Sequence, residues 1–353
     1  MEWTNTHAVL AGKELGPGLP PYVIAEVGAN HNGDMGLCRR LIDEAKSSGA
    51  DAVKFQSWTD KSLIARSEYE RNTSYSDKKK HFGSLEEMVK AYQLTEEMHF
   101  QAAEYCSRVG ITFCSSAFSD AEVDLLDRIG VPFHKVASMD INNLDLIAKM
   151  AASGKPVLLS TGMSTLGEIE RAVEYLLSCG NARILLLHCV SIYPPRPEIV
   201  RLRNIPMLRD TFALPVGFSD HTFGVACAIG ATSLGACCIE KHFTLDKEMA
   251  GWDHAISADP SEMRLLVDGT AEVALSLGDA RRIVSPDEIE KAKKFRRSIV
   301  VTRDLPAGHV LTREDLAFKR PGTGIAPDLV DFVVGRTLRR NLGEDDLLSW
   351  EEF

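Results

Sequence analysis

The chain repeats one pattern eight times in about 280 residues: a short apolar run followed by an amphipathic stretch, which in six cases ends in glycine before the next run. Short runs that are apolar throughout are typical of strands buried on both faces of a parallel sheet. Eight βα units of this length predict a TIM barrel, closed by a last helix over residues 261–278. A doubly wound sheet is the alternative, but it would more naturally have fewer strands and a G-x-G-x-x-G loop, which we do not find. The expected strands are 22–28, 51–57, 111–117, 132–138, 156–162, 183–189, 215–220 and 237–243.

Signals at the helix ends agree with these boundaries. Ser or Thr with Glu three residues later predicts a capping box at Ser84, Ser119 and Thr165. Glycine just before the next strand predicts a left-handed helix end. We expect such ends at Gly49, Gly110, Gly130, Gly154, Gly180 and Gly235. Residues 7–20, ahead of the first strand, have the glycine and proline content of a short hairpin or an irregular lead-in.

The composition changes after the last βα unit. We predict a barrel domain over residues 1–281, a charged helical linker over 282–296 and a second domain over 297–353. The second domain has short strand candidates such as 297–302 and frequent turn signals, which indicates a β-rich fold. It is small enough to bury little surface alone, so we expect it to dock on a barrel, of its own chain or of a partner.

The overall composition excludes several classes of function. A net charge of −10 argues against nucleic-acid binding, and no run approaches the 18 apolar residues that cross a membrane. The eight cysteines form no C-x-x-C pair, which favours free thiols in a reducing compartment. The N-terminus has no signal-peptide pattern. We therefore expect a cytoplasmic protein that binds a small molecule.

Ionisable residues gather where two neighbouring strands end. His221 follows the seventh expected strand and His242 lies at the end of the eighth, with Glu240 and Asp253 nearby. In a TIM barrel these ends face one cavity, where two histidines can share a divalent metal and carboxylates can move protons. For either histidine alone, a structural hydrogen bond at a strand terminus is the simpler interpretation.

The other strand ends add groups that bind an anion. Lys54 and Lys135 lie within apolar strands, where a buried ammonium requires an anionic partner. A bound phosphate or carboxylate fits this need, and an internal salt bridge with Glu26 or Glu240 is the alternative. The remaining polar candidates at strand ends are Gln56, Ser116, Ser138, Ser160 and Tyr193.

Seven segments carry a resemblance to a known family: IAEVGANHNGD, AVKFQSW, HKVAS, LLSTGMS, LLHCVSIYP, VGFSDHT and IEKHFTLD. They resemble the N-acetylneuraminate (sialic acid) synthase family, which includes legionaminic and pseudaminic acid synthases. The tail from RRSIVVT to KRPGTGI is similar to that family's antifreeze-like SAF domain, a β-clip fold. The resemblance implies a transferase that condenses phosphoenolpyruvate with an N-acylated mannosamine-type aldose, cleaving a C–O bond and releasing phosphate.

The same resemblance implies roles for individual residues. Phosphoenolpyruvate would be held by Lys54, Lys135, Ser138 and Ser160. A divalent Mn²⁺ or Mg²⁺ would be bound by His221 and His242. The sugar and metal region would be lined by Glu26, Tyr193, Glu240 and Asp253, with Glu26 or Asp253 moving protons. Arg320 would reach into the partner's barrel in a domain-swapped homodimer and contact the acyl-amino group of the sugar.

The chain departs from the family pattern near the expected sugar site. Trp252 stands in a segment that commonly reads Pro-Gly-Pro-Asp-His, and the third strand reads Cys-Ser-Ser-Ala-Phe. Residues 60–83, with a run of lysines, have no clear family match. These departures concern the acceptor sugar more than the reaction.

Competing functions stay open at this point. A class I aldolase or lyase acting on a 2-keto sugar acid would use Lys54 or Lys135 to form a Schiff base. A metal-dependent hydrolase would be expected to carry an H-x-H pair after the first strand, which the sequence lacks. A pure binding module would leave the converging lysines and histidines without a role.

Overall fold

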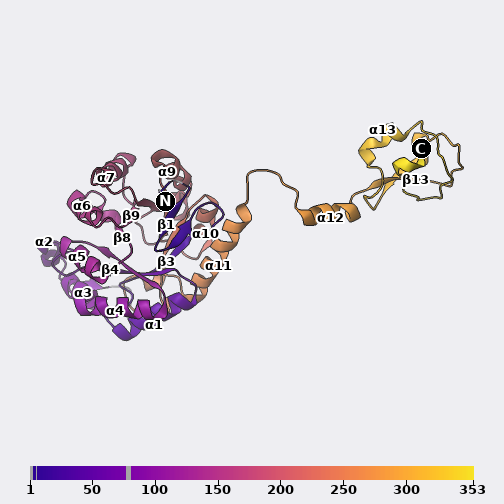
Figure 1. The fold of residues 1–353 in the computed structure, drawn as a ribbon. Coiled ribbons are helices and arrows are strands. Elements are labelled where there is room, and N and C mark those ends of the chain that lie inside the picture. The colour runs from indigo at the N-terminus through magenta and orange to yellow at the C-terminus, as the bar shows by residue number, and fades with distance from the viewer. Residues whose placement is uncertain (1–2, 5, 77–80) are drawn as a thin grey trace. The chain divides into compact units, whose positions relative to one another are not determined.

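A computed structural model describes residues 3–4, 6–76 and 81–353, and the lysines at 78–80 therefore lie outside the described residues. The chain forms two compact units, Met1–Gly278 and Asp279–Phe353 (Figure 1). In the part of the chain that is described, no helix is both long and apolar enough to cross a membrane.

The first unit is the predicted barrel. Eight parallel strands close on themselves in the order β10-β11-β12-β3-β4-β7-β8-β9, so β12 pairs with β3 to complete the ring. Their bounds lie within the eight predicted runs. The strands are β3 (Tyr22–Gly28), β4 (Ala52–Ser57), β7 (Thr112–Ala117), β8 (His134–Val136), β9 (Val157–Ser160), β10 (Ile184–Cys189), β11 (Val216–Asp220) and β12 (Cys238–His242).

Helices follow each strand and surround the barrel (Figure 1). They are α1 (Met35–Ser47), α4 (Glu96–Val109), α5 (Asp120–Ile129), α6 (Leu144–Ala152), α7 (Leu166–Ser178), α9 (Asn204–Phe212), α10 (Ala226–Ser233) and α11 (Pro260–Leu277). The connection from β4 to α4 is the most elaborate. It contains α2 (Arg66–Arg71), the strands β5 (Tyr75–Ser76) and β6 (His81–Gly83), and α3 (Leu85–Tyr92), while α8 (Pro197–Val200) precedes α9.

The barrel interior has an apolar half, where the strands begin, and a polar half, where they end. Tyr22 and Ile24 of β3 pack inside, whereas Glu26, two residues further, lines a cavity. The same change occurs from Ala52 to Lys54 in β4. Because successive side chains of a strand point to opposite faces, Tyr22, Ile24 and Glu26 all face the interior, and the change from apolar to polar occurs along the length of the strand. The apolar half also contains Cys114, Phe133, Leu158, Leu185, Leu187 and Cys238.

The predicted lead-in is an antiparallel hairpin, β1 (Ala8–Leu10) with β2 (Lys13–Leu15). Its Ala8, Leu10 and Leu15 belong to the same buried apolar cluster as the inner residues of the barrel. The hairpin therefore packs against the barrel at the end where the strands begin. This leaves the opposite end of the barrel for the polar side chains.

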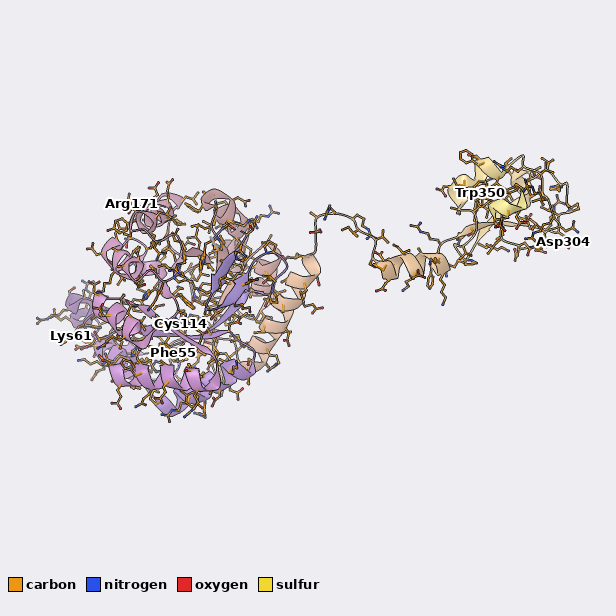
Figure 2. The ribbon with its side chains drawn as sticks, viewed as in Figure 1. Phe55, Lys61, Cys114, Arg171, Asp304 and Trp350 are labelled. Atoms are coloured by element: carbon orange, nitrogen blue, oxygen red, sulfur yellow. The ribbon has the colours of Figure 1, made fainter. Side chains whose placement is uncertain are left out.

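A second apolar layer lies between the strands and the helices. Val23, Ala25 and Val27 of β3 alternate with its inward residues and pack with Leu41 and Ile42 of α1. Phe55 of β4 belongs to this layer and stacks on Phe113, with ring centroids 5.4 Å apart. Figure 2 shows Phe55 and Cys114 within the barrel unit and Lys61 and Arg171 at its edge.

The helix-end predictions are largely confirmed. Capping boxes form at Ser84 and Thr165, and all six predicted glycines have positive φ. The prediction of a capping box at Ser119 is wrong, because the Ser119 side chain makes no hydrogen bond to the helix N-terminus. Glu122 instead accepts the backbone N–H of Phe118 at 2.9 Å and the hydroxyl of Ser62, so it joins two loops.

The second unit begins with α12 (Pro286–Phe295), within the stretch predicted as a charged helical linker, and Ser285 caps it. Strands β13 (Ser298–Val301) and β14 (Leu316–Lys319) pair antiparallel, and α13 (Val330–Val333) follows. A small core forms around residues of these segments. The core residues are Ile299, Val301, Leu305, Leu311, Ile325, Val330, Val333, Leu338, Leu342 and Leu348.

The buried carboxylate of Asp315 organises the turns of this unit. It accepts hydrogen bonds from Arg303 at 2.6 Å, from His309 at 2.9 Å and from the backbone and hydroxyl of Thr312 at 2.9 Å. Burial alone would raise the pKa of Asp315, but the bonds from His309 and Thr312 outweigh burial and lower it. A buried charged side chain thus joins these turns in addition to the apolar core of the unit.

Candidate active site

A cavity of about 490 Å³ opens where the barrel strands end. Every barrel strand contributes to its lining, since the polar half of the interior forms its floor. Of the predicted site residues, twelve lie in this one cavity. They are Glu26, Lys54, Gln56, Ser116, Lys135, Ser138, Ser160, Tyr193, His221, Glu240, His242 and Asp253.

The floor of the cavity holds two lysines and two glutamates. Lys54 Nζ lies 2.7 Å from Glu26 Oε2 and 3.7 Å from Glu240 Oε2. Lys135 Nζ lies 4.0 Å from the same Glu240 oxygen. The internal salt bridges considered from the sequence are therefore present. Their charges balance, so an entering anion has to displace a carboxylate from a lysine or bring a proton with it.

Hydroxyl and amide groups fix the four charged side chains. Lys135 donates to Ser160 Oγ at 2.7 Å, and Lys54 donates to Ser116 Oγ at 3.2 Å. Gln56 Nε2 donates to Glu26 Oε1 at 2.9 Å, while Ser219 Oγ donates to Glu240 Oε1 at 2.8 Å. Each of the four bonds joins side chains of two neighbouring strands, so the barrel itself orients the charges.

Burial and neighbouring charges set different pKa values for the two glutamates. Burial raises the pKa of Glu26 to about 7, because it outweighs the attraction of Lys54. Burial would also raise the pKa of Glu240, but Lys135 and Lys54 together lower it to about 2. Two carboxylates whose pKa values are pushed apart are suited to different tasks. Glu26 can exchange a proton near neutral pH, and Glu240 remains charged.

The two lysines differ as well. Burial would lower the pKa of Lys54, but Glu240 and Glu26 raise it. Lys135 is buried and lies 4.0 Å from its carboxylate partner Glu240, so burial outweighs that attraction and lowers the pKa of Lys135. Lys54 is accordingly a fixed positive charge, and Lys135 is the amine more easily deprotonated.

The two histidines lie side by side at the ends of β11 and β12, with ring centroids 5.4 Å apart. His221 Nδ1 is 3.0 Å from the Val190 carbonyl, which would leave Nε2 for another partner. His242 Nδ1 is buried without a hydrogen bond, 3.9 Å from Asp253 Oδ2. Burial lowers the pKa of His242 well below its usual range, and burial raises that of Asp253 to about 6.

These observations fit a metal held by two imidazoles. A divalent metal requires a neutral imidazole with an unused ring nitrogen, and His242 meets this condition. Burial would lower the pKa of His221 as well, but Cys189 and the Val190 carbonyl raise it, so a metal there has to displace a proton. The carboxylate of Asp253 beside His242 can orient such a ligand. No group of three or more histidine, cysteine or acidic side chains is arranged for a metal among the residues described. A metal here would thus take several of its ligands from substrate or water.

A buried ion pair is formed by the two residues that directly precede the histidines. Lys241 Nζ lies 2.9 Å from Asp220 Oδ2, and the two residues face each other across β11 and β12. Asp220 also accepts the Thr222 backbone N–H at 2.9 Å, and Lys241 donates to the Thr222 carbonyl. Because His221 and His242 directly follow Asp220 and Lys241, this pair holds the two strand ends in register.

The loop that carries Asp253 is fastened to the end of the first barrel strand. Asn32 Nδ2 donates to the Ala250 carbonyl at 2.9 Å, and Ser257 Oγ donates to the Asp253 carbonyl at 2.7 Å. Asn30 in turn donates to Ser257 at 2.9 Å. Asn30, which follows β3, thus holds the loop of Asp253 in place through Ser257 and does not itself line the cavity.

Comparisons with known proteins agree with this geometry. The NeuB family model matches residues 41–282, about two thirds of the chain. The chain belongs to the NeuB family. A SAF domain model matches residues 296–353, so the barrel and the second unit each correspond to a recognised part.

Individual relatives of the NeuB chain cover nearly its full length. It is 39% identical to the N,N'-diacetyllegionaminic acid synthase of Legionella pneumophila over 97% of each chain. It is 32% identical to human N-acetylneuraminate-9-phosphate synthase over 96% of this chain and 94% of that one. The crystal structure of N-acetylneuraminic acid (sialic acid) synthetase from Leptospira borgpetersenii, in complex with citrate, matches with a TM-score of 0.73 and 31% identity. It covers 82% of this chain and 96% of that one.

Arg320 is the predicted site residue that lies outside this NeuB barrel. It belongs to the second unit, where its guanidinium lies over the Phe295 ring, 5.0 Å from the centroid. Its contact with the sugar in a partner's barrel stays a prediction, and so does the formation of a homodimer.

Ser191 and Ser219, which follow the sixth expected strand and belong to the seventh, also line the cavity. Several other lining residues were missed from the sequence. They are Trp58, Leu63, Phe118, Ala137, Met139, Met163, Cys189 and Trp252, although Trp252 was noted as a departure. The strand period could have found two of them, since Trp58 continues the series of Lys54 and Gln56, and Cys189 ends β10 on the inward face. His188, its neighbour, points away and bonds the Val200 carbonyl at 2.7 Å.

Proposed function

We propose that this chain condenses phosphoenolpyruvate with an N-acylated mannosamine-type aldose to form a nonulosonic acid and inorganic phosphate. The floor of the cavity carries this proposal: Lys54 and Lys135 with their hydroxyl partners, beside the paired histidines. Lysines and hydroxyls bind phosphate and carboxylate groups, and their setting between Glu26 and Glu240 supplies groups that can release or accept protons. The names of the relatives are consistent with this reaction.

The reaction balances without a redox partner. The methylene carbon of phosphoenolpyruvate attacks the aldehyde carbon, and a C–C bond forms while the aldehyde oxygen takes up a proton. Water adds to the carbon that bears the phosphate and loses a proton. The C–O bond to phosphate then breaks, leaving the 2-keto acid and inorganic phosphate.

The chain's residues have distinct tasks in this scheme. Lys54 and Lys135, bonded to Ser116 and Ser160, would hold the phosphate and carboxylate of phosphoenolpyruvate. Glu26, with its pKa raised to about 7 by burial, would supply the proton to the aldehyde oxygen or take one from water. A Mn²⁺ or Mg²⁺ held by His221 and His242 would act as a Lewis acid towards the aldehyde oxygen. Asp253, close to His242, is the second candidate for proton transfer.

Phosphate release tests the proposal. Phosphoenolpyruvate labelled with oxygen-18 at the bridging position is incubated with N-acetylmannosamine or related sugars, with Mn²⁺ or with EDTA. Release that requires both sugar and metal, with the label in the phosphate, is the expected result. Release of unlabelled phosphate would mean P–O cleavage, and activity that survives EDTA would remove the metal from the scheme.

Variants connect the activity to the cavity. Lys135→Met is expected to abolish phosphate release, whereas Lys149→Met is expected to leave it unchanged. Lys149 is a matched control because it pairs with Asp124 at 2.6 Å outside the cavity. Equal activity in both variants would contradict the role given to the floor.

A Schiff-base aldolase is the second candidate, and the lowered pKa of Lys135 favours it specifically. Burial makes this lysine the easier of the two to deprotonate, as a nucleophilic amine requires. Borohydride in the presence of a 2-keto sugar acid would then add the mass of the substrate to Lys135. No mass increase is expected if the condensation is correct.

A further inference from the structure

The mouth of the cavity differs from its floor in having a wall of aromatic and thioether side chains. Trp58, Phe118, Met139, Met163 and Trp252 line the cavity alongside its polar residues. Trp58 is buried, whereas Trp252 and the two methionines are exposed. An exposed aromatic side chain at the opening of a polar cavity is available to contact a ligand.

Trp252 is held in place and does not lie loosely on the surface. Its ring meets that of Trp58 edge to face at 86°, with centroids 6.0 Å apart. Trp58 in turn packs edge to face on Phe118 at 6.1 Å. The chain ahead of Trp252 is fixed as well, because Asn32 bonds the Ala250 carbonyl. Such a supported ring presents a preformed apolar surface at low entropic cost.

The wall begins next to the reacting end of the proposed site and continues to the exposed side chains at the mouth of the cavity. Trp252 directly precedes Asp253, whose carboxylate is 3.9 Å from His242. A sugar whose aldehyde reacts beside His242 therefore extends along Trp252. The carbons furthest from the aldehyde, or an acyl substituent, are the parts that would lie against the ring.

Cationic side chains are concentrated at the floor. Of the described residues that line the cavity, Lys54 and Lys135 are the lysines, each within 4.0 Å of Glu240, and arginine does not occur among them. A phosphate on the sugar would face tryptophan and methionine at the mouth, where those residues offer it no positive charge. The wall suits a methyl or acetamido group better, since these bury apolar surface.

We propose that Trp252, supported by Trp58, is the specificity-determining residue for the acceptor sugar. It selects an uncharged, N-acylated sugar whose far end is a deoxy carbon, over a sugar phosphate or one that ends in a hydroxymethyl group. This inference rests on the proposed condensation. It concerns the acceptor alone and leaves the binding of phosphoenolpyruvate to the floor.

The test compares three acceptors with the full-length protein: a diacetamido-trideoxy hexose, N-acetylmannosamine and N-acetylmannosamine 6-phosphate. The wild-type protein is expected to have its highest kcat/KM with the deoxy sugar. In apolar pockets, one added apolar group on a substrate changes kcat/KM by roughly tenfold or more. Trp252→Ala should therefore raise the KM for this sugar about tenfold. The KM for phosphoenolpyruvate should be unchanged, and Trp252→Phe should recover part of the loss.

Trp350→Ala is the matched control, because Trp350 is a half-exposed tryptophan of the second unit, outside the barrel. It should leave all three acceptors unchanged. A wild-type preference for the 6-phosphate would overturn the inference, as would a Trp252→Ala variant that retains the original preference. Calorimetric binding of phosphoenolpyruvate alone separates the two proposals. If it does not bind, the proposed function fails; if it binds and the acceptor order differs from ours, the role of Trp252 fails by itself.

Discussion

The ion pair between Asp220 and Lys241 allows a quantitative test of what holds the histidine strands together. The two side chains are 0% and 1% exposed. Lys241→Met keeps the length of the side chain but leaves Asp220 as a buried charge without its cation. Loss of one partner from a buried pair costs about 3–5 kcal/mol. Asp220 keeps the Thr222 backbone N–H, so we expect the lower end, about 3 kcal/mol.

Calorimetric melting of the full-length protein measures this loss in the barrel transition. A domain of this size loses roughly 2–4 °C in Tm per kcal/mol, so Lys241→Met should lower the Tm by about 6–12 °C. Arg66→Met provides the comparison. Arg66 pairs with Glu70 at 2.8 Å, but the two side chains are 91% and 62% exposed. Exposed helix pairs are worth about 0.5 kcal/mol at most, so its Tm should hardly change.

A double variant tests the cause of the loss. Asp220→Asn combined with Lys241→Met removes both charges and should recover most of the stability, because the cost comes from the unpaired carboxylate. The reasoning is refuted if Lys241→Met melts within about 2 °C of the wild type. A double variant whose loss equals the sum of the single losses would also refute it.

Three further predictions address protonation and the second unit. Burial raises the pKa of Glu26 to about 7; if its carboxylate acts as a base, kcat/KM falls as the pH drops through about 7, and this limb is absent in Glu26→Gln. A limb that persists in the variant would exclude Glu26. Asp315 has a lowered pKa in the folded state, so its contribution is present above the unfolded pKa of about 3.9 and is lost as the pH falls below it. Asp315→Asn should therefore lower the Tm of the second unit at pH 7 and weaken its acid dependence, and an unchanged acid dependence would contradict this. Arg320→Lys should raise the KM for the sugar and leave that for phosphoenolpyruvate, whereas equal sugar KM values would show that Arg320 makes no such contact.

The sequence predicted the barrel well because burial and strand period coincide in it. The outward side of the eight barrel strands is largely apolar, so hydrophobicity located all eight of them. The polar residues that interrupt the pattern, such as Lys54 and Glu240, were found for the same reason. A charged residue inside an apolar run stands out.

Side chains that serve the site without charge were harder to find. Trp58 and Met163 look like ordinary core residues in the sequence, since nothing local separates an aromatic wall from a hydrophobic core. Ser119 and Glu122 carry the spacing of a capping box, yet Glu122 bonds Phe118 and Ser62. The spacing of Ser119 and Glu122 could not reveal that Ser62 competes for the Glu122 carboxylate, because Ser62 lies in a different βα connection.

The division of the barrel interior into an apolar and a polar half has an evolutionary consequence. The residues that stabilise the fold, around Tyr22, Phe133 and the β1–β2 hairpin, are separate from those that line the cavity at the other end. Loops such as the one that carries Trp252 can therefore vary while the foundation remains intact. A single architecture can in this way be inherited by enzymes with different sugar products, each arising through changes at the rim.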